Sequence, residues 1–344
     1  MKLNTREKIG IAVALGVGAA VARRLLRAQY SFAGKTVLIT GGSRGLGLVL
    51  ARAFAAEGAR IVLCARDLST LGRACDELGE AGAEVLAVAA DVTLDLDVRS
   101  LLAAVGDRFG PVDVLVNNAG TMDVGPLESM TEDDFARAMD THFWGPLRLM
   151  EAVLPSMRDL GAGRIVNVVS IGGVVPVPHM IPYTASKFAL GGLSEAMAAE
   201  LVREGVTVTT VYPGLMRTGS TRHARFKGQH RAEHAWFTLL DALPLASMNA
   251  GRAARQIVEA CRRGDARVVL SVPAKLAVFA RGVAPNLVAR VTGLVGRLLP
   301  TPGGLGTASR KGYESESPVT LSVLTALDRK AAAANNEVAP GKPN

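Results

Sequence analysis

Short apolar runs alternate with longer stretches of helical pattern along most of this 344-residue chain. The apolar runs are rich in valine and isoleucine and occupy residues 36–40, 59–65, 84–91, 112–120, 163–170, 206–213 and 266–271. Continuous apolar runs of this length are typical of strands that are covered on both faces. The alternation predicts an α/β fold, a doubly wound parallel sheet of the Rossmann type, in a single catalytic domain over residues 35–272 with N- and C-terminal extensions.

Composition and charge exclude several classes of site and partner. A content of 49% hydrophobic residues supports a sizeable core. The three cysteines lack CxxC spacing, so they suggest neither a disulfide framework nor a thiolate metal site and favour a reducing, cytoplasmic compartment. Most of the net charge of +8 comes from residues before the first strand and from residues 274–299. The main domain is therefore close to neutral, which argues against a nucleic-acid partner.

A glycine-rich loop, TGGSRGLG, follows the first predicted strand and directly precedes a helix at residues 40–47. Glycines permit a tight turn and let the backbone approach a pyrophosphate, while the helix N-terminus offers N–H groups and a positive dipole end. This context predicts a dinucleotide site. Its cofactor-binding residues are Thr40, Gly41, Ser43, Arg44, Gly45, Leu46 and Gly47.

The end of the second predicted strand indicates which dinucleotide binds. An acid at this position would hold the ribose hydroxyls of NAD, whereas an arginine would accommodate the 2′-phosphate of NADP. The chain has Arg66 here, and Arg44 lies in the glycine loop itself. Two guanidiniums can flank one phosphate, so we expect NADP(H). In the alternative, both arginines are solvated and Asp67 selects the cofactor.

A tyrosine and a lysine lie four positions apart in the sequence PYTASK, as Tyr183 and Lys187. Positions i and i+4 of a helix share a face, so an ammonium would lie near a phenol and lower its pKa. Tyr183 is then a candidate acid that protonates a carbonyl oxygen as hydride arrives at the carbon. Ser170 ends a predicted strand and can hydrogen-bond the same oxygen. A solvated polar seam on a helix is the alternative.

The motifs TGGSRGLG, NNAG (117–120), Ser170, YTASK (183–187) and PGLMRT (213–218) occur in an order and spacing that resembles the short-chain dehydrogenase/reductase family over about residues 36–270. This resemblance implies a nicotinamide cofactor, hydride exchange between an alcohol and a carbonyl, and a homodimer or homotetramer. It also implies that Lys187 holds the nicotinamide ribose. Further cofactor contacts are implied for Asp91, Val92, Asn118, Ala119, Gly120, Pro213, Gly214 and Thr218.

One position departs from that family pattern. An asparagine usually supports a water in the proton relay, but this chain has His142 in the sequence DTHFWGP. A histidine could anchor the water, or titrate near neutral pH and gate the relay. We include His142 among the candidate catalytic residues. A packed histidine, with the relay routed through backbone groups, is an equal alternative.

The region between residues 214 and 249 corresponds to the segment that caps the substrate in this family. It contains Met216, Phe226, Trp236, Phe237, Leu239 and Leu240 beside five cations, Arg217, Arg222, Arg225, Lys227 and Arg231. The apolar residues predict a lid for a lipophilic carbonyl compound, and the cations could meet an acidic group on the substrate or form a solvated basic loop. Three histidines, His223, His230 and His234, have no interleaved acid or thiol, so no metal is expected.

The two ends form separate segments. Residues 1–34 are apolar and basic, and the apolar run at 9–22 would give a helix of about 21 Å, shorter than a hydrocarbon core of about 30 Å. We rank an uncleaved membrane anchor or interfacial helix first, a docked helix second and a cleaved signal peptide third. Residues 273–302 predict a basic amphipathic helical segment suited to an anionic membrane, or else a cover for the pocket or a dimer partner. Residues 303–344 are predicted to be a mobile tail.

The sequence therefore predicts an NADP(H)-dependent oxidoreductase that transfers a hydride between the nicotinamide and a carbonyl or alcohol of a lipophilic substrate, in the cytoplasm and associated with a membrane through the N-terminal segment. One alternative is a 3-oxoacyl thioester reductase. Another is a non-catalytic NADP-binding sensor or scaffold, although the complete set of Ser170, Tyr183 and Lys187 argues against it.

Overall fold

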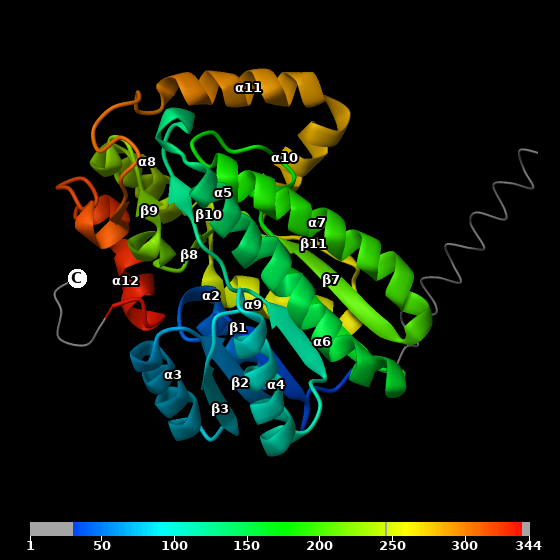
Figure 1. The fold of residues 1–344 in the computed structure, drawn as a ribbon. Helices are drawn as coiled ribbons and strands as arrows, with labels where there is room; N and C mark the ends of the chain where they lie inside the picture. The colour runs from blue at the N-terminus through cyan, green and yellow to red at the C-terminus, as the bar shows by residue number, and fades with distance from the viewer. Residues whose placement is uncertain (1–29, 245, 339–344) are drawn as a thin grey trace, which may run out of the picture. The chain divides into compact units, whose positions relative to one another are not determined.

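The central feature of this computed structural model is one seven-stranded parallel sheet (Figure 1). The structure describes residues 30–244 and 246–338. The strand order is β11-β7-β6-β4-β1-β2-β3, and every pairing in this sheet is parallel. The strands are β1 (Thr36–Thr40), β2 (Arg60–Ala65), β3 (Val85–Ala89), β4 (Val114–Asn117), β6 (Gly163–Val168), β7 (Val206–Tyr212) and β11 (Arg267–Val269). The predicted fold class is confirmed.

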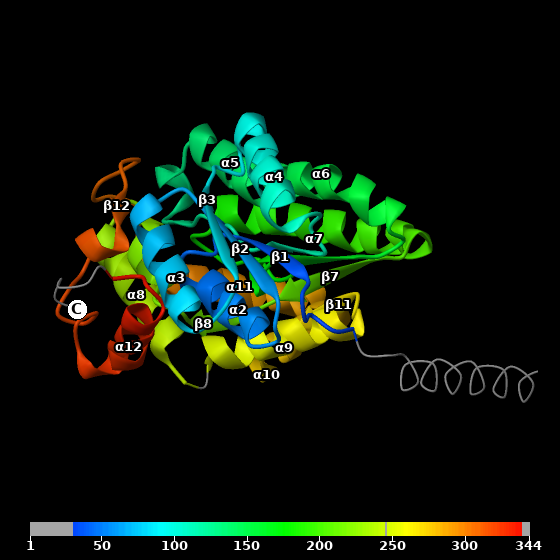
Figure 2. The same ribbon diagram turned by 90° about the horizontal axis from the view of Figure 1, so that it is seen from below.

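Helices cover both faces of this sheet (Figure 2). One face carries α4 (Asp95–Phe109), α6 (Gly145–Asp159) and α7 (Ile181–Leu201), which join the sheet in one apolar core. The other face carries α2 (Gly45–Ala55), α3 (Leu68–Glu80) and α9 (Ala250–Arg263). Because both faces are covered, the strands are mainly apolar, and all five residues of β1 are buried.

The helical stretch over residues 132–159 is divided in the structure. It consists of α5 (Glu132–Met139), a π-helical turn η2 (Asp140–Trp144) and α6. Single π-helical turns inside helices insert an extra residue and often occur at functional sites. This turn contains His142 and directs its ring into the protein interior, where it is fully buried.

A smaller region lies beyond the C-terminal edge of the sheet. Strand β9 (Arg225–Phe226) pairs with both β5 (Asp123–Val124) and β12 (Arg310–Lys311). A second pair is formed by β8 (Leu215–Arg217) and β10 (Ser247–Asn249), with α8 (His230–Ala242) packed against it. Strand β12 belongs to the C-terminal segment, so that segment is hydrogen-bonded into the main domain.

The C-terminal segment differs from the mobile tail expected from its composition. After α10 (Val272–Val283) and α11 (Pro285–Leu298), the chain forms β12, short turns η6 (Gly312–Glu314) and η7 (Val323–Thr325), and α12 (Ala326–Ala334). Ala332 is buried, and a Cβ on Gly219 would lie 2.3 Å from its Cα. The small residues that suggested mobility here permit close packing of backbones instead.

Within the described ranges, no helix is both long enough and apolar enough to cross a membrane. The predicted anchor at residues 9–22 lies outside the described residues. Its role stays a prediction.

Candidate active site

The glycine loop is held by the end of the neighbouring strand β4. The hydroxyl oxygen of Thr40 accepts hydrogen bonds from the N–H groups of Asn118 and Ala119, each at 3.0 Å. The side-chain amide of Asn118 donates to the carbonyl oxygen of Gly41 at 3.3 Å. A Cβ on Gly47 would lie 2.0 Å from that same oxygen, so only glycine fits there. The turn is therefore a tight cradle, as a pyrophosphate site requires.

The N-terminus of α2 is suited to an anion. Arg44 is the N-cap residue, its side chain forms no capping hydrogen bond, and the first turn contains no acidic side chain. Gly45 has a φ of +55°, a conformation that favours glycine. The positive end of the helix dipole and the nearby guanidinium both favour a phosphate at this point.

Arg66 and Asp67, which follow the end of β2, differ in how their side chains are held. The side chain of Arg66 is 73% exposed, and its Nη1 lies 3.4 Å from Oδ2 of Asp91. Asp67 is instead the N-cap of α3, where Oδ1 accepts from the N–H of Thr70 at 2.7 Å and from Ser69 Oγ at 2.8 Å. These hydrogen bonds lower the pKa of Asp67 to about 2. The Asp67 carboxylate is thus engaged in capping a helix.

The other predicted cofactor residues gather at the same edge of the sheet. Parallel strands end together at one edge, so residues far apart in sequence meet there. The following residues lie directly beyond strand ends in the structure: Asp91 and Val92 after β3, Asn118, Ala119 and Gly120 after β4, Pro213 and Gly214 after β7, and Thr218 after β8.

Ser170 and Tyr183 converge above Gly172. Ser170 lies two residues beyond β6, and its Oγ accepts from the N–H of Gly172 at 3.0 Å. Tyr183 is the third residue of α7. A Cβ on Gly172 would lie 3.2 Å from Cε1 of Tyr183 and 3.4 Å from Oγ of Ser170. The two hydroxyl-bearing side chains therefore share one small space at the C-terminal edge of the sheet.

Lys187 lies one helical turn after Tyr183, as the spacing predicts. Its Nζ donates to the carbonyl oxygen of Val168 at 2.9 Å and lies 5.9 Å from the centre of the Tyr183 ring. Burial lowers the pKa of Lys187 to about 7. Burial also raises the pKa of Tyr183, and a side-chain hydrogen bond with Ser170 opposes this rise. The expected lowering of the Tyr183 pKa by Lys187 is absent because removal from water penalises both charged forms.

Both ring nitrogens of His142 are used by the protein. Nε2 accepts from the N–H of Thr121 at 3.1 Å, so the proton resides on Nδ1, which lies 2.7 Å from Oγ of Ser186. Ser186 in turn donates to the carbonyl oxygen of Tyr183 at 2.9 Å. Burial and the neighbouring Lys187 hold the pKa of His142 well below its usual range. Titration of His142 near neutral pH is therefore not supported, and the packed alternative fits the structure.

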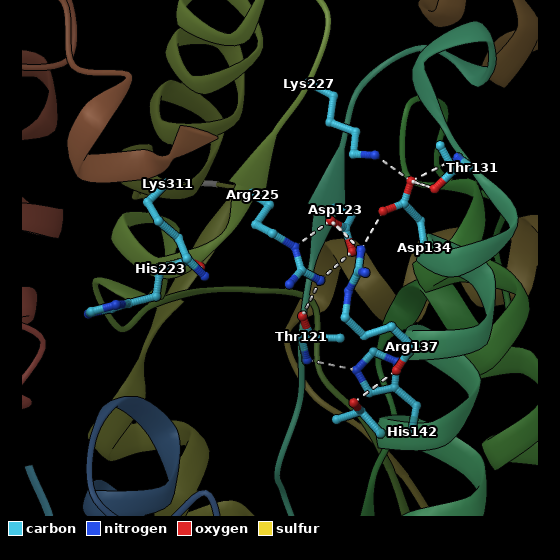
Figure 3. A network of polar contacts seen from close by, with 11 residues as sticks. Thr121, Asp123, Thr131, Asp134, Arg137, His142, His223, Arg225, Lys227 and Lys311 are labelled. Atoms are coloured by element: carbon cyan, nitrogen blue, oxygen red, sulfur yellow. Dashed lines mark hydrogen bonds and ion pairs between the residues drawn. The ribbon is translucent and has the colours of Figure 1, made fainter. Parts of the chain in front are cut away.

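A network of ion pairs connects the neighbourhood of His142 to residues 214–249, the region expected to form the lid (Figure 3). Arg225 donates to Oγ1 of Thr121 at 3.1 Å and to both carboxylate oxygens of Asp123 at 2.6 and 2.9 Å. In the same network, the Lys227 ammonium donates to Oδ2 of Asp134 at 2.5 Å. Both lid cations are thus committed to protein acids. The expectation that they meet an acidic group of the substrate does not hold for these two residues.

The lid places an apolar wall beside Tyr183. Phe226 and Phe237 are buried in a cluster with Met180, and the partly buried rings of Tyr183 and Trp236 pack against this cluster. That this cluster forms a lid over a lipophilic compound stays a prediction. The cluster joins α7, β9 and α8, which no local pattern in the sequence connects.

The three histidines of the lid region have separate partners. The Nδ1 atoms of His230 and His234 lie near Oγ and O of Ser315, at 2.9 and 3.2 Å, and His223 lies near Glu337. Across the described residues no group of three or more His, Cys, Asp or Glu side chains is arranged to hold a metal ion. Sequence reasoning missed Thr121 and Ser186, which fix His142, because a hydrogen-bond partner leaves no motif.

Comparison with known proteins agrees with this geometry. A family model described as short chain dehydrogenase matches residues 35–228. The chain is 38% identical over 193 residues to the ketoacyl reductase HetN of a Nostoc species, a match covering 56% of this chain and 67% of that protein. A short-chain dehydrogenase from Streptomyces avermitilis superposes with a TM-score of 0.66 and 31% identity over 76% of this chain and 97% of its own.

A third similar protein was solved with a cofactor. Actinorhodin polyketide ketoreductase with NADPH has a TM-score of 0.61 and 32% identity, covering 71% of this chain and 97% of its own. The family match covers more than half of the present chain, and its region contains the glycine loop and the Tyr183 site. The chain therefore belongs to the short-chain dehydrogenase family, whose members are oxidoreductases that bind a nicotinamide cofactor.

Proposed function

We propose that this protein is an NADP(H)-dependent reductase of a lipophilic carbonyl compound. The observation that carries the proposal is the convergence of Ser170 and Tyr183 over Gly172, at the sheet edge where the glycine loop also lies. A carbonyl oxygen in that space would meet two hydroxyl groups. The apolar wall of Phe226 and Phe237 would face the rest of the substrate.

In this proposal the chain's own residues position the carbonyl and move one proton. Ser170 donates a hydrogen bond from its hydroxyl to the carbonyl oxygen and so polarises the bond. Tyr183 gives its phenolic proton to the same oxygen, which becomes an alcohol. The nicotinamide, when bound, supplies the hydride for the carbonyl carbon. Lys187 is one turn away, with its Nζ 5.9 Å from the centre of the Tyr183 ring, and would hold the nicotinamide ribose.

Two observations support NADP over NAD. Arg44 and Arg66 come from the loop and strand ends that would face the adenosine ribose, and Asp67 caps α3. The similar actinorhodin ketoreductase was solved with NADPH. A guanidinium pairs well with a phosphate dianion and gives no partner to two ribose hydroxyls.

A 3-oxoacyl thioester is the second candidate substrate, because the similar Nostoc protein is named a ketoacyl reductase. Purified protein should be tested for NADPH oxidation with lipophilic ketones, aldehydes and 3-oxoacyl thioesters. Turnover that disappears in Tyr183→Phe would support the reductase. NADPH binding with no turnover on any of these compounds would favour the non-catalytic sensor instead.

We further propose that the surface of α10 and α11 binds an anionic membrane. None of the residues of α11 is buried. Nine large apolar side chains are exposed on the two helices: Val272, Leu276, Phe279, Val283, Leu287, Val291, Leu294, Val295 and Leu298. Residues 272–299 contain four cations and no acid, so their charge complements anionic lipid headgroups.

This surface is tested by flotation with vesicles of phosphatidylcholine alone or mixed with phosphatidylserine. Leu294→Glu should reduce binding to the anionic vesicles, whereas Leu68→Glu, at an exposed leucine of α3, should not. Equal binding of wild type and Leu294→Glu would contradict the proposal. Conversion of a dimer to a monomer by Leu294→Glu, measured by light scattering, would assign the surface to a second copy and overturn it.

A further inference from the structure

The C-terminal residues Asn335–Glu337 lie on the glycine loop. The N–H of Gly45 donates to the carbonyl oxygen of Asn335 at 2.9 Å. The side-chain amide of Asn336 donates to the carbonyl oxygens of Ser43 at 2.8 Å and Thr70 at 2.9 Å. This stretch, which we call the latch, therefore makes direct hydrogen bonds with the same loop that is predicted to receive the cofactor phosphates.

Glu337 brings a buried carboxylate to the N-terminus of α2. Only 2% of its side chain is exposed, and Oε2 lies 3.3 Å from Nε of Arg44 and 3.2 Å from Nε2 of His223. Neither contact has hydrogen-bond geometry, so Oε2 has no hydrogen-bond partner among the described residues. The other oxygen, Oε1, would lie 2.7 Å from a Cβ on Gly45. A carboxyl group thus occupies the positive end of the helix beside Arg44.

The latch also contacts Thr218, another residue that is predicted to bind the cofactor. Asn335 donates from its side-chain amide to the carbonyl oxygen of Thr218 at 3.3 Å. Seven residues before Asn335, Asp328 of α12 accepts from the N–H of Gly219 at 3.2 Å and from Oγ1 of Thr221 at 3.2 Å. The C-terminal segment thereby connects the glycine loop to the chain that follows β8, and α12 lies near α3 and α8 in both views (Figures 1 and 2).

We propose that the latch is an intramolecular competitor of the cofactor, in which the Glu337 carboxylate takes the place of a cofactor phosphate at Arg44 and the α2 N-terminus. The proposal rests on the proposed use of NADP(H). Arg44 and the Gly45 N–H serve the latch in this structure, and the carboxylate would repel an incoming phosphate at the same point. Cofactor binding therefore requires the latch to leave the loop.

The test is NADPH binding without substrate, measured by cofactor fluorescence at pH 8. Burial raises the pKa of Glu337 to about 7, so the carboxylate is mostly ionised at this pH. Glu337→Gln should lower the Kd for NADPH by about 5- to 20-fold, and deletion of residues 335–344 should lower it at least as much. Glu316→Gln is the matched control, because Glu316 pairs with Arg222 at 2.8 Å instead of with the loop. Its Kd should equal that of the wild type.

A second measurement follows the latch itself. Lys330 lies in α12 and is exposed, so trypsin should cut there faster when saturating NADPH displaces the latch. Equal Kd values for wild type and both latch variants would overturn the proposal. Weaker binding in the variants would show that the segment retains the cofactor, which also overturns competition. If wild type and all variants fail to bind NADPH, the cofactor assignment itself is refuted.

Discussion

Replacement of Gly47 by alanine tests how tightly the glycine loop is built. The added Cβ would lie 2.0 Å from the carbonyl oxygen of Gly41, whereas real Cβ atoms essentially never approach within 3.0 Å. The loop would have to move by about 1 Å, because the nearest neighbour is a backbone carbonyl that cannot rotate away, and Nδ2 of Asn118 would also lie only 2.7 Å from the new Cβ. Overpacking of this kind costs about 1–3 kcal/mol. Since the loop is the proposed phosphate site, we expect NADPH affinity to fall by about 10- to 100-fold.

The matched control is Gly72→Ala in α3, where a Cβ would meet no atom within 4 Å. Alanine at an exposed helical position should stabilise the protein by about 0.5–1 kcal/mol and leave NADPH affinity unchanged. Both variants can be compared by urea unfolding and by NADPH fluorescence titration. If Gly47→Ala bound NADPH as tightly as wild type, the reasoning that this close approach shapes the cofactor site would be refuted.

Further predictions concern the residues of the site. Tyr183→Phe should lower kcat by about 10²- to 10⁴-fold while NADPH affinity changes little; a near-normal kcat would remove Tyr183 from the proton transfer. Arg66→Asp should shift the ratio of affinities towards NADH, and an unchanged ratio measured by titration with both cofactors would contradict the arginine assignment. His142→Asn should leave the pH profile of turnover unchanged near neutrality, because the buried ring stays neutral, and should cost about 1–3 kcal/mol in unfolding free energy through its lost hydrogen bonds. For Lys187, burial lowers the pKa from 10.5 to about 7 in the folded protein. Between these two pH values the unfolded chain therefore binds more protons than the folded protein. The free energy of unfolding consequently gains a contribution that rises with pH from about 7 to 10. Urea unfolding at pH 7 and pH 9 should show a smaller rise for Lys187→Met than for wild type, and equal rises would count against the burial argument.

The sequence was sufficient for features that depend on local pattern. Apolar runs covered on both faces produced the strands, and the glycines at 41 and 47 marked a turn that sterically requires them. The i, i+4 spacing placed Tyr183 and Lys187 on one face of α7, because helical geometry is the same wherever a helix forms. These features follow from short-range geometry, which can be read directly from the residue spacing in the sequence.

The ionisation of the site required the tertiary structure. Proximity along the helix suggested that Lys187 lowers the pKa of Tyr183, but the depth of burial is set by the elements packed around them, and it raises the pKa of Tyr183. The sequence likewise allowed His142 to titrate near neutral pH, because it does not show how deeply the ring is buried. Its neutral state comes from burial and from the neighbouring Lys187, while its ring is held by hydrogen bonds with Thr121 and Ser186, which lie 21 and 44 residues away.

The C-terminal segment shows most clearly that composition alone does not predict whether a segment packs. Small residues in residues 303–344 predicted mobility, because few large apolar side chains are available to bury. In the structure, Ala332 packs directly on Gly219. The hydrogen bonds of Asn335 and Asn336 join backbone groups of the glycine loop and of Thr218. The sequence by itself determined the sheet, the glycine turn and the Tyr183–Lys187 pair. Only the tertiary structure decided the ionisation of the Tyr183–Lys187 pair. It also brought Glu337 to Arg44, because contacts across nearly 300 residues depend on how the whole chain folds.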